Sequence, residues 1–501
     1  MIVDKMKNII KYSFLFVILI SVTSCKKWLD LKPQDGIVRQ DFWKTKEQVN
    51  AAVTGIYSSM LNTDRGGMAE LFFIWGEARA DMVAPGFRAD AAELDIVNLN
   101  MLPSNSYTSW RVFYQTINYC NTVIELAPGV LAVDNTFTKE QLNTAVGEAL
   151  TIRALMYFYL TRSFGQVPLK LDATISDENI TPIPKVGSDT ILNQIVKDLK
   201  QAEPYLPLTY NNVNTDKGRV TRFTVNALLA DVYLWMEKYA ESVAECNKVI
   251  DSKRFGLIGN GAPLFDEVFF QGNSNESIFE LQFDVQKLNP FYFMHMANTR
   301  RWGAAPHIME DVYGVDMVNT VPLQDLRGDG NALRASDLSI WKYIGANSAG
   351  TSIRAVDQSF AHWIFYRYAD ILLMKAEAIN QLDQPLEASK LVQVIRDRAK
   401  ALDFNGTMDP TSKSAMEEFI LQERQREFAF EGKRWYDLLR NAKRNNYQQL
   451  NYLIKMAAIS IPSDRQQAAF NKLRDKNSHY FPIYLYEMQT NKLLVQNPFY
   501  K

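Results

Sequence analysis

Apolar residues recur at helical spacing in many separate segments of this 501-residue chain. The clearest stripe contains Val225, Leu228, Leu229, Val232 and Trp235, which fall on one face of a helix. The same pattern predicts helices over residues 44–60, 110–126, 139–164, 189–203, 227–236, 240–250, 366–382, 385–400 and 416–440. The chain is therefore predicted to be mainly α.

Two pairs of the predicted helices read as helical hairpins. Only three residues separate 227–236 from 240–250, and Asp383-Gln384 separates 366–382 from 385–400, where Pro385 suits a first helical turn. These hairpins are tetratricopeptide-like, although their spacing along the chain is too irregular for a regular repeat array.

Residues 254–365 have a different character. They are rich in Gly, Asn and aromatic residues, and they contain short alternating runs such as residues 278–283. This pattern predicts loops and short strands. Because binding residues are often carried on loops held by a rigid scaffold, this region is a candidate for ligand binding.

The amino terminus has the pattern of a lipoprotein signal peptide. Lys5, Lys7 and Lys11 precede and border an apolar run over residues 12–22, and small residues lead to Cys25. The run is about half as long as a membrane-spanning helix. We therefore expect residues 1–24 to be removed and Cys25 to carry the lipid. An ordinary secretory signal with a chance cysteine is the alternative.

Composition and charge narrow the function classes. Hydrophobic residues make up 47% and charged residues 22% of the chain, as in a globular protein. The formal charge of −1 provides no field that would draw the protein onto nucleic acid, so we expect no nucleic-acid partner. Aromatic residues reach 12%, more than core packing alone usually requires, which suggests that some contact a ligand.

Motifs for enzymatic chemistry are missing from the sequence. There is no phosphate loop, dinucleotide fingerprint, Gly-x-Ser-x-Gly elbow or His-Glu-x-x-His site, and the four histidines are scattered without metal-ligand spacing. Cys120 and Cys246 lie among apolar residues of helical patterns, so we expect both to be buried and free. No metal, cofactor or catalytic residue is predicted.

The densest charged segment is residues 423–440, in which Glu423, Glu427 and Glu431 share one face of the predicted helix. A structural interpretation pairs these carboxylates with Arg424, Arg426 and Arg434 in a partly buried ionic lattice, with Gly432 allowing a bend or close approach. A functional interpretation makes two of them the acid and base of a glycoside hydrolase. We favour the structural one, because a catalytic acid must be kept apart from cations to hold its proton at neutral pH.

Several motifs along the chain are similar to one known family. They are Cys25-Lys26-Lys27-Trp28-Leu29-Asp30, residues 148–160 with Phe164-Gly165-Gln166-Val167-Pro168, Gly218-Arg219-Val220-Thr221, Asp325-Leu326-Arg327, residues 366–378, residues 423–440, Phe481-Pro482-Ile483 and Gln496-Asn497-Pro498. In this order, and over nearly the whole mature chain, they resemble the SusD/RagB family of outer-membrane nutrient-binding lipoproteins.

The resemblance implies a fold, a place and a partner. The fold would be a single helical domain over residues 25–501, with four tetratricopeptide-like hairpins as scaffold, decorated by loops. The protein would be lipid-anchored in the outer membrane, facing the cell exterior. Its partner would be a SusC-type TonB-dependent transporter, to which such proteins pass glycans or other nutrients.

The ligand site has to be argued from this chain, because the family's ligand contacts lie in variable loops. Sugars present flat C–H faces and hydroxyl rims, so a glycan site needs exposed aromatic faces beside planar polar groups. Two loop regions, 81–107 and 289–302, offer that combination. The candidate ligand-binding residues are Asp81, Arg88, Asn105 and Tyr107 in the first and Tyr292 and Trp302 in the second.

Trp302 is the strongest of these candidates on sequence grounds. It follows Arg300 and Arg301 and precedes Gly303, in a stretch without helical or strand periodicity. We therefore expect an exposed indole that stacks on a sugar ring. The alternative is that Trp302 packs inward and pins its loop to the scaffold.

The leading function is capture of an oligosaccharide or other nutrient without a catalytic step. One alternative is a helical-hairpin protein that only assembles partners, which buried loop aromatics would favour. A second alternative is a surface glycoside hydrolase, which needs two carboxylates roughly 5 to 10 Å apart in an open cleft.

Overall fold

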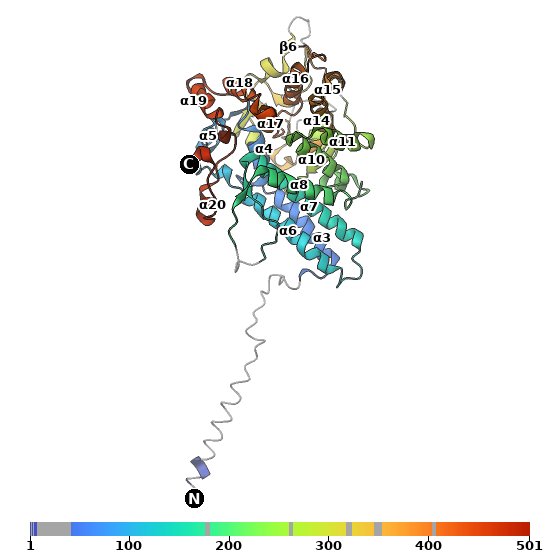
Figure 1. Cartoon of the computed structure of the whole chain (residues 1–501), viewed down its shortest axis with the longest axis vertical. Coiled ribbons are helices and arrows are strands. Elements are labelled where there is room, and N and C mark those ends of the chain that lie inside the picture. The colour runs from blue at the N-terminus through green and yellow to red at the C-terminus, as the bar shows by residue number, and fades with distance from the viewer. Residues whose placement is uncertain are drawn as a thin grey trace.

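The computed structural model describes residues 42–175, 181–259, 264–316, 323–344, 353–402 and 407–501, together with residues 1, 3 and 5–7 (Figure 1). Cys25 and nearly all of the predicted signal peptide lie outside the described residues. The described chain is mainly helical, which confirms the predicted fold class.

The first half of the scaffold is a stack of four long helices. α3 (Lys46–Met60) packs against α6 (Arg111–Val130), α6 against α7 (Lys139–Phe164), and α7 against α8 (Ser188–Ala202) (Figure 1). Thr45 and Thr138 cap α3 and α7, each with a Gln three residues on that completes a capping box. These caps fix where both helices begin.

The second half continues the stack with two helical hairpins. α10 (Arg222–Trp235) packs on α11 (Tyr239–Asp251), α11 on α14 (Tyr368–Gln381), and α14 on α15 (Pro385–Ala399). Both hairpins lie where the sequence predicts them, and Pro385 is in the first turn of α15.

The predicted helix over 416–440 is in fact two helices. α16 (Lys413–Glu427) ends before a tight turn, and α17 (Arg434–Tyr447) starts after it. Phe430 and Gly432 in this turn have φ of 67° and 66°. A helix cannot continue through that left-handed backbone, so the prediction of one continuous helix is wrong.

One buried helix escapes sequence detection. Every residue of α4 (Met68–Glu77) is buried, so the helix has no polar face to create an amphipathic pattern. The shorter helical elements are α5 (Ala91–Val97), α9 (Val213–Gly218), α13 (Phe291–His295), α18 (Asn451–Ser460), α19 (Ser463–Leu473), α20 (Leu485–Thr490), η2 (Ser106–Thr108), η3 (Phe265–Gln271), η4 (Ile308–Tyr313), η5 (Val356–Gln358), η6 (Lys476–His479) and η7 (Pro498–Tyr500).

The strands of the described chain form antiparallel pairs rather than one sheet. The pairs are β1 (Val83–Pro85) with β5 (Trp302–Ala304), β2 (Val167–Pro168) with β3 (Lys185–Val186), β4 (Ser277–Leu281) with β10 (Trp363–Arg367), β6 (Val315–Asp316) with β7 (Leu323–Gln324), and β8 (Leu333–Arg334) with β9 (Ser339–Ile340). Most lie within residues 254–365, which confirms the loops and short strands predicted there. The β4–β10 pair is fully buried against the helices.

Candidate functional site

The β1–β5 pair brings together the two loop regions that the sequence singles out. Val83, Ala84 and Pro85 pair with Ala304, Gly303 and Trp302. Beyond the ladder, the backbone N–H of Gly86 donates to the carbonyl of Arg301 at 2.7 Å, and the N–H of Arg301 donates to Met294 at 3.0 Å. The β1–β5 pair therefore places parts of regions 81–107 and 289–302 side by side, although about 200 residues separate them in sequence.

Two phenylalanines are exposed on this surface. The side chains of Phe87 and Phe293 are 66% and 58% exposed. The guanidinium of the exposed Arg88 lies 5.8 Å from the centre of the Phe87 ring, and the half-buried Tyr292 ring lies 5.4 Å from that of Phe293. We call Phe87, Arg88, Tyr292 and Phe293 the loop surface.

Two of the predicted ligand-binding residues, Arg88 and Tyr292, are accessible on the loop surface. Their contact with a ligand stays a prediction. Phe87 and Phe293 were not among the candidates, although each is an aromatic residue beside one of them in the sequence. Their position next to Arg88 and Tyr292 in the sequence is the signal that could have identified them.

The expectation that Trp302 is an exposed platform is wrong. Its indole has no exposed surface, and its ring meets the edge of Phe73 of α4 at 6.3 Å between centroids. Pairing with Pro85 turns this side chain inward, where it fills space beside α4. The alternative interpretation, in which Trp302 pins its loop to the scaffold, matches this burial.

Asp81 and Asn105 are also buried, and both support the surface from below. The carboxylate of Asp81 accepts two hydrogen bonds of 2.8 Å from Arg434, and Arg434 outweighs the effect of burial and lowers the pKa of Asp81. Asn105 accepts from the N–H of Tyr107 at 3.1 Å and donates to the carbonyl of Ala92 at 2.8 Å. Neither side chain is free to meet a ligand.

Tyr107 joins a buried polar network beneath the loop surface. Its hydroxyl receives hydrogen bonds from Arg65 at 3.0 Å and from Arg301 at 2.6 Å, and it donates to Glu93 at 3.3 Å. Arg301 also pairs with Glu70 and Glu93. Burial, reinforced by Glu70, raises the pKa of Tyr107 and keeps the phenol protonated. The network holds the Arg301 backbone on which the exposed residues depend.

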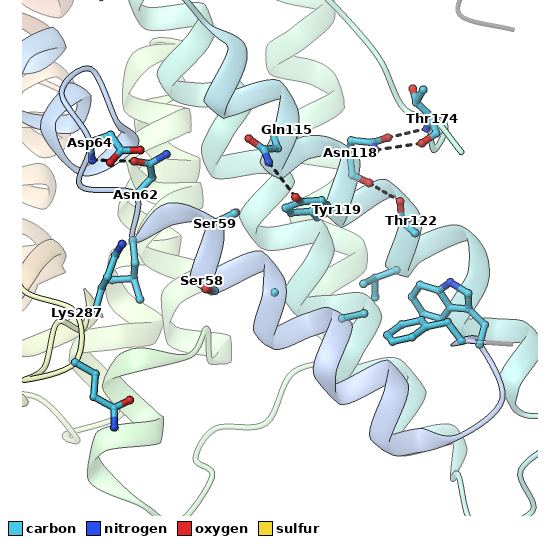
Figure 2. Close-up of a pocket in the computed structure, with 17 residues that line it drawn as sticks. Ser58, Ser59, Asn62, Asp64, Gln115, Asn118, Tyr119, Thr122, Thr174 and Lys287 are labelled. Carbon is cyan, nitrogen blue, oxygen red and sulfur yellow. Dashed lines mark hydrogen bonds between the residues drawn. The ribbon is translucent and has the colours of Figure 1, made fainter. Parts of the chain in front are cut away.

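A second feature is an open groove of about 1010 Å³ between α3 and α6 (Figure 2). It is lined by Phe42, Trp43, Ala52, Gly55, Ser58, Ser59, Leu61, Asn62, Asp64, Gln115, Asn118, Tyr119, Thr122, Val123, Thr174, Gln286 and Lys287. The sequence prediction missed this groove. Its signal is the polar and aromatic face that residues 115, 118, 119 and 122 form on the predicted helix 110–126.

Two sets of hydrogen bonds order one wall of the groove. Gln115 donates to the hydroxyl of Tyr119 at 2.9 Å. Asn118 accepts from the N–H of Thr174 at 2.7 Å and donates to its carbonyl at 3.3 Å (Figure 2). The wall therefore offers pre-positioned amide and phenol groups.

Two family models match the chain. One, described as "Starch-binding associating with outer membrane", matches residues 27–234, and one described as the SusD family matches residues 313–500. The chain belongs to the SusD/RagB family.

Named relatives and solved structures agree with this assignment. SusD-like protein P38 of Formosa agariphila is 29% identical over 492 residues, which cover 88% of this chain and 92% of the relative. A SusD-like protein of Bacteroides ovatus is 23% identical over 475 residues, which cover 85% of this chain and 81% of the relative. A SusD superfamily structure from Bacteroides vulgatus has a TM-score of 0.73 at 23% identity and covers 91% of this chain and 100% of its own.

The glutamates that the sequence groups together are buried in this SusD-family protein. Glu431 accepts from Lys342 at 2.7 Å and from Arg367 at 2.8 Å. The other contacts are those of Glu423 with Arg327, Arg396 and Arg426 and those of Glu427 with Arg327, Arg367 and Arg398. We call these residues the ionic lattice. It confirms the structural interpretation.

The partners within the ionic lattice differ from the predicted ones. Of the three predicted arginines, only Arg426 contacts these glutamates. Arg424 pairs instead with Asp437 at 2.9 Å, and Arg434 pairs with Asp81. Arg434 opens α17, beyond the break, whereas Arg424 lies within α16 and pairs with Asp437 of α17 rather than with the glutamates of its own helix.

The carboxylates of the ionic lattice stay ionised. Burial alone would raise the pKa of Glu431, but Arg367 and Lys342 outweigh it and lower that pKa to about 2. Arg398 and Arg367 likewise hold the pKa of Glu427 well below its usual range. A catalytic acid needs the opposite shift, so these carboxylates do not form the acid and base of a hydrolase.

Two further observations concern the described residues only. They contain no group of three or more His, Cys, Asp or Glu side chains arranged to hold a metal ion. None of their helices is both long and apolar enough to span a membrane. Cys120 and Cys246 are buried and free, as predicted.

Proposed function

We propose that this protein captures an oligosaccharide at the cell surface and passes it, without a chemical step, to a SusC-type TonB-dependent transporter. It would be held in the outer membrane by a lipid on Cys25. Support comes from the SusD/RagB family and from the description of the model that matches residues 27–234, which names starch binding and association with the outer membrane.

The loop surface is the observation that carries the proposal. Soluble proteins bury most large aromatic rings, yet Phe87 and Phe293 both project from segments held at the backbone of Arg301. An exposed ring face suits the C–H face of a sugar, and the guanidinium of Arg88 has donors for its hydroxyls. We assign ligand contact to Phe87, Arg88, Tyr292 and Phe293, and support to the buried Asp81, Asn105, Tyr107 and Trp302.

A glycan array followed by calorimetric titration tests the assignment. We expect Phe87→Ala and Phe293→Ala each to weaken binding of the best array ligand about tenfold, close to 1.4 kcal/mol, because each loses a stacking face. The matched control is Tyr486→Ala, which truncates an aromatic side chain that is 61% exposed on α20. If both phenylalanine variants bind with parental affinity, the loop surface is not part of the site. If the parent protein releases shorter sugars from the ligand, a hydrolase is favoured instead.

The anchor has its own test. Stable membrane attachment requires several acyl chains, so Cys25→Ala should move the protein from the membrane to the soluble fraction. The experiment is fractionation in a strain that lacks the partner transporter, with Cys120→Ala as control. Continued membrane attachment of Cys25→Ala in that strain would contradict the lipid anchor.

A further inference from the structure

The groove between α3 and α6 is long enough for a chain rather than a single sugar. On the α3 side its lining runs from Phe42, before the helix, to Asp64, beyond the last residue of that helix. A helix of 15 residues is about 22 Å long at about 1.5 Å per residue. A volume of about 1010 Å³ also lies at the upper limit of ordinary small-ligand pockets.

The lining suits an uncharged ligand with many hydroxyl groups. The lining includes the aromatic rings of Trp43 and Tyr119 and the amides of Asn62, Gln115 and Asn118, which is the mixture of flat apolar faces and planar polar groups that sugars match. Figure 2 shows Gln115 and Tyr119 on the helix face that looks across to Ser58 and Ser59.

The charges of the groove balance each other. Its lining contains one carboxylate, Asp64, and one ammonium group, Lys287. In the described part of the chain, neither group takes part in an ion pair. A strongly anionic or cationic ligand would find no net attraction here, whereas both groups can hydrogen-bond to hydroxyls.

Two short stretches of the chain connect the groove to the loop surface. Asp64 lines the groove, and the next residue, Arg65, pairs with Asp90, three residues after Phe87. On the other side Lys287 lines the groove five residues before Tyr292 of the loop surface. One extended ligand can therefore contact both features.

We propose that the α3–α6 groove holds the far units of an extended, uncharged oligosaccharide whose other end lies on the loop surface. This rests on the proposed function and adds to it that the ligand is a chain of several units. The affinity of the protein should then rise with chain length beyond what the loop surface alone can contact.

Gly55 allows the groove to be filled with little effect on the fold. A Cβ atom built on Gly55 meets no heavy atom within 4 Å, and the residue lies in the body of α3. Gly55→Trp should therefore occupy the groove. Gly129→Trp is the matched control, because Gly129 is a helical glycine of α6 with the same open space that does not line the groove.

The experiment measures binding to arrays printed with neutral glucans, xylans and mannans of two to eight units. Thermal melts show whether every variant is folded. We expect the parent protein and Gly129→Trp to bind longer members more tightly, and Gly55→Trp to lose at least tenfold in affinity for the longest members. Tyr119→Ala should reduce the same chain-length dependence by a smaller factor.

The outcomes separate the two proposals. If the parent protein binds no glycan, the proposed function fails and this inference falls with it. Suppose instead that the parent binds glycans and that the thermal melt shows Gly55→Trp to be folded. If the affinity of Gly55→Trp then rises with chain length as in the parent, only the groove proposal is overturned. Gly55→Trp could also bind glycans as the parent does but no longer co-purify with the transporter. That result would assign the groove to a protein partner and would overturn the groove proposal.

Discussion

Trp302 contributes to stability rather than to recognition. Its indole is fully buried between β5 and α4, so truncation leaves a cavity that the paired strands cannot close. We expect Trp302→Ala to lower the free energy of unfolding by about 3–5 kcal/mol. Chemical denaturation measures this, with Phe293→Ala as the exposed aromatic control, expected to change stability by about 0.5 kcal/mol at most. An unchanged denaturation midpoint in Trp302→Ala would contradict the structural role.

Glu77 makes stability depend on pH. Its side chain is fully buried, one carboxylate oxygen accepts from the N–H of Phe430 at 3.2 Å, and the other has no partner in the described chain. Burial raises the pKa of Glu77 from 4.5 to about 8. The folded state therefore keeps a proton that the unfolded chain releases above pH 4.5, and this contribution to stability is lost as the pH rises from 4.5 to 8.

The expected slope follows from proton linkage. The free energy of unfolding should fall by at most about 1.4 kcal/mol per pH unit across this window through Glu77. Glu77→Gln, which stays neutral, should flatten that decline. Denaturation series at pH 5, 6, 7 and 8 measure it, and identical pH profiles for the two proteins would show that Glu77 does not titrate as inferred.

At the scale of elements, α4 packs closely on the turn between α16 and α17, and a glycine from each lies at the contact. A Cβ atom at Gly76 would overlap the carbonyl group of Gly432, and Gly432 itself has φ of 66°. We expect Gly76→Ala to destabilise the protein by about 3 kcal/mol, because rigid backbone cannot move aside as a side chain would. Gly55→Ala is the opposite case, in open space within α3, and should stabilise by up to about 1 kcal/mol. Equal melting temperatures for these two variants would contradict the close contact.

The same elements show what sequence could and could not predict. α7 lies over residues 139–164 as predicted, with the Thr138 capping box at its start, and its 26 residues are too many for a strand although residues 145–164 are all buried. α4 was missed because burial on all sides leaves no periodic stripe. The break after α16 depends on left-handed backbone at Phe430, a residue type that gives no warning of it.

The candidate site was predictable only in outline. The two loop regions were identified from their aromatic and planar polar residues, but their three-residue strands are too short to show an alternating pattern. Which side chain of β5 points inward depends on pairing with Val83–Pro85, a contact across more than 200 residues. The sequence therefore favoured Trp302, which is buried, and passed over Phe293, which is exposed.

At the scale of the whole molecule, the ionic lattice connects the helical scaffold to the loop-rich region. Arg367, the last residue of β10, contacts Glu276, which precedes β4, as well as Glu427 and Glu431 at and just after the end of α16. Lys342 reaches Glu431 from the segment after β9. Both cations are almost fully buried, with side chains only 1% and 2% exposed, so each depends on its carboxylates for charge balance.

Removing one carboxylate should therefore affect the whole fold. We expect Glu431→Ala to lower the free energy of unfolding at pH 7 by about 3 kcal/mol or more, because Lys342 and Arg367 keep their buried charges without this partner. Since Arg367 and Lys342 lower the pKa of Glu431 from 4.5 to about 2, its contribution is complete above pH 4.5 and disappears as the pH falls to 2. The difference in stability between parent and variant should shrink over that range.

The control is Glu387→Ala, which breaks an exposed pair with Lys390 and should cost less than about 1 kcal/mol. Denaturation midpoints for the three proteins from pH 2 to 7 decide the matter, and equal losses at Glu431 and Glu387 would mean that the lattice does not hold the two regions together.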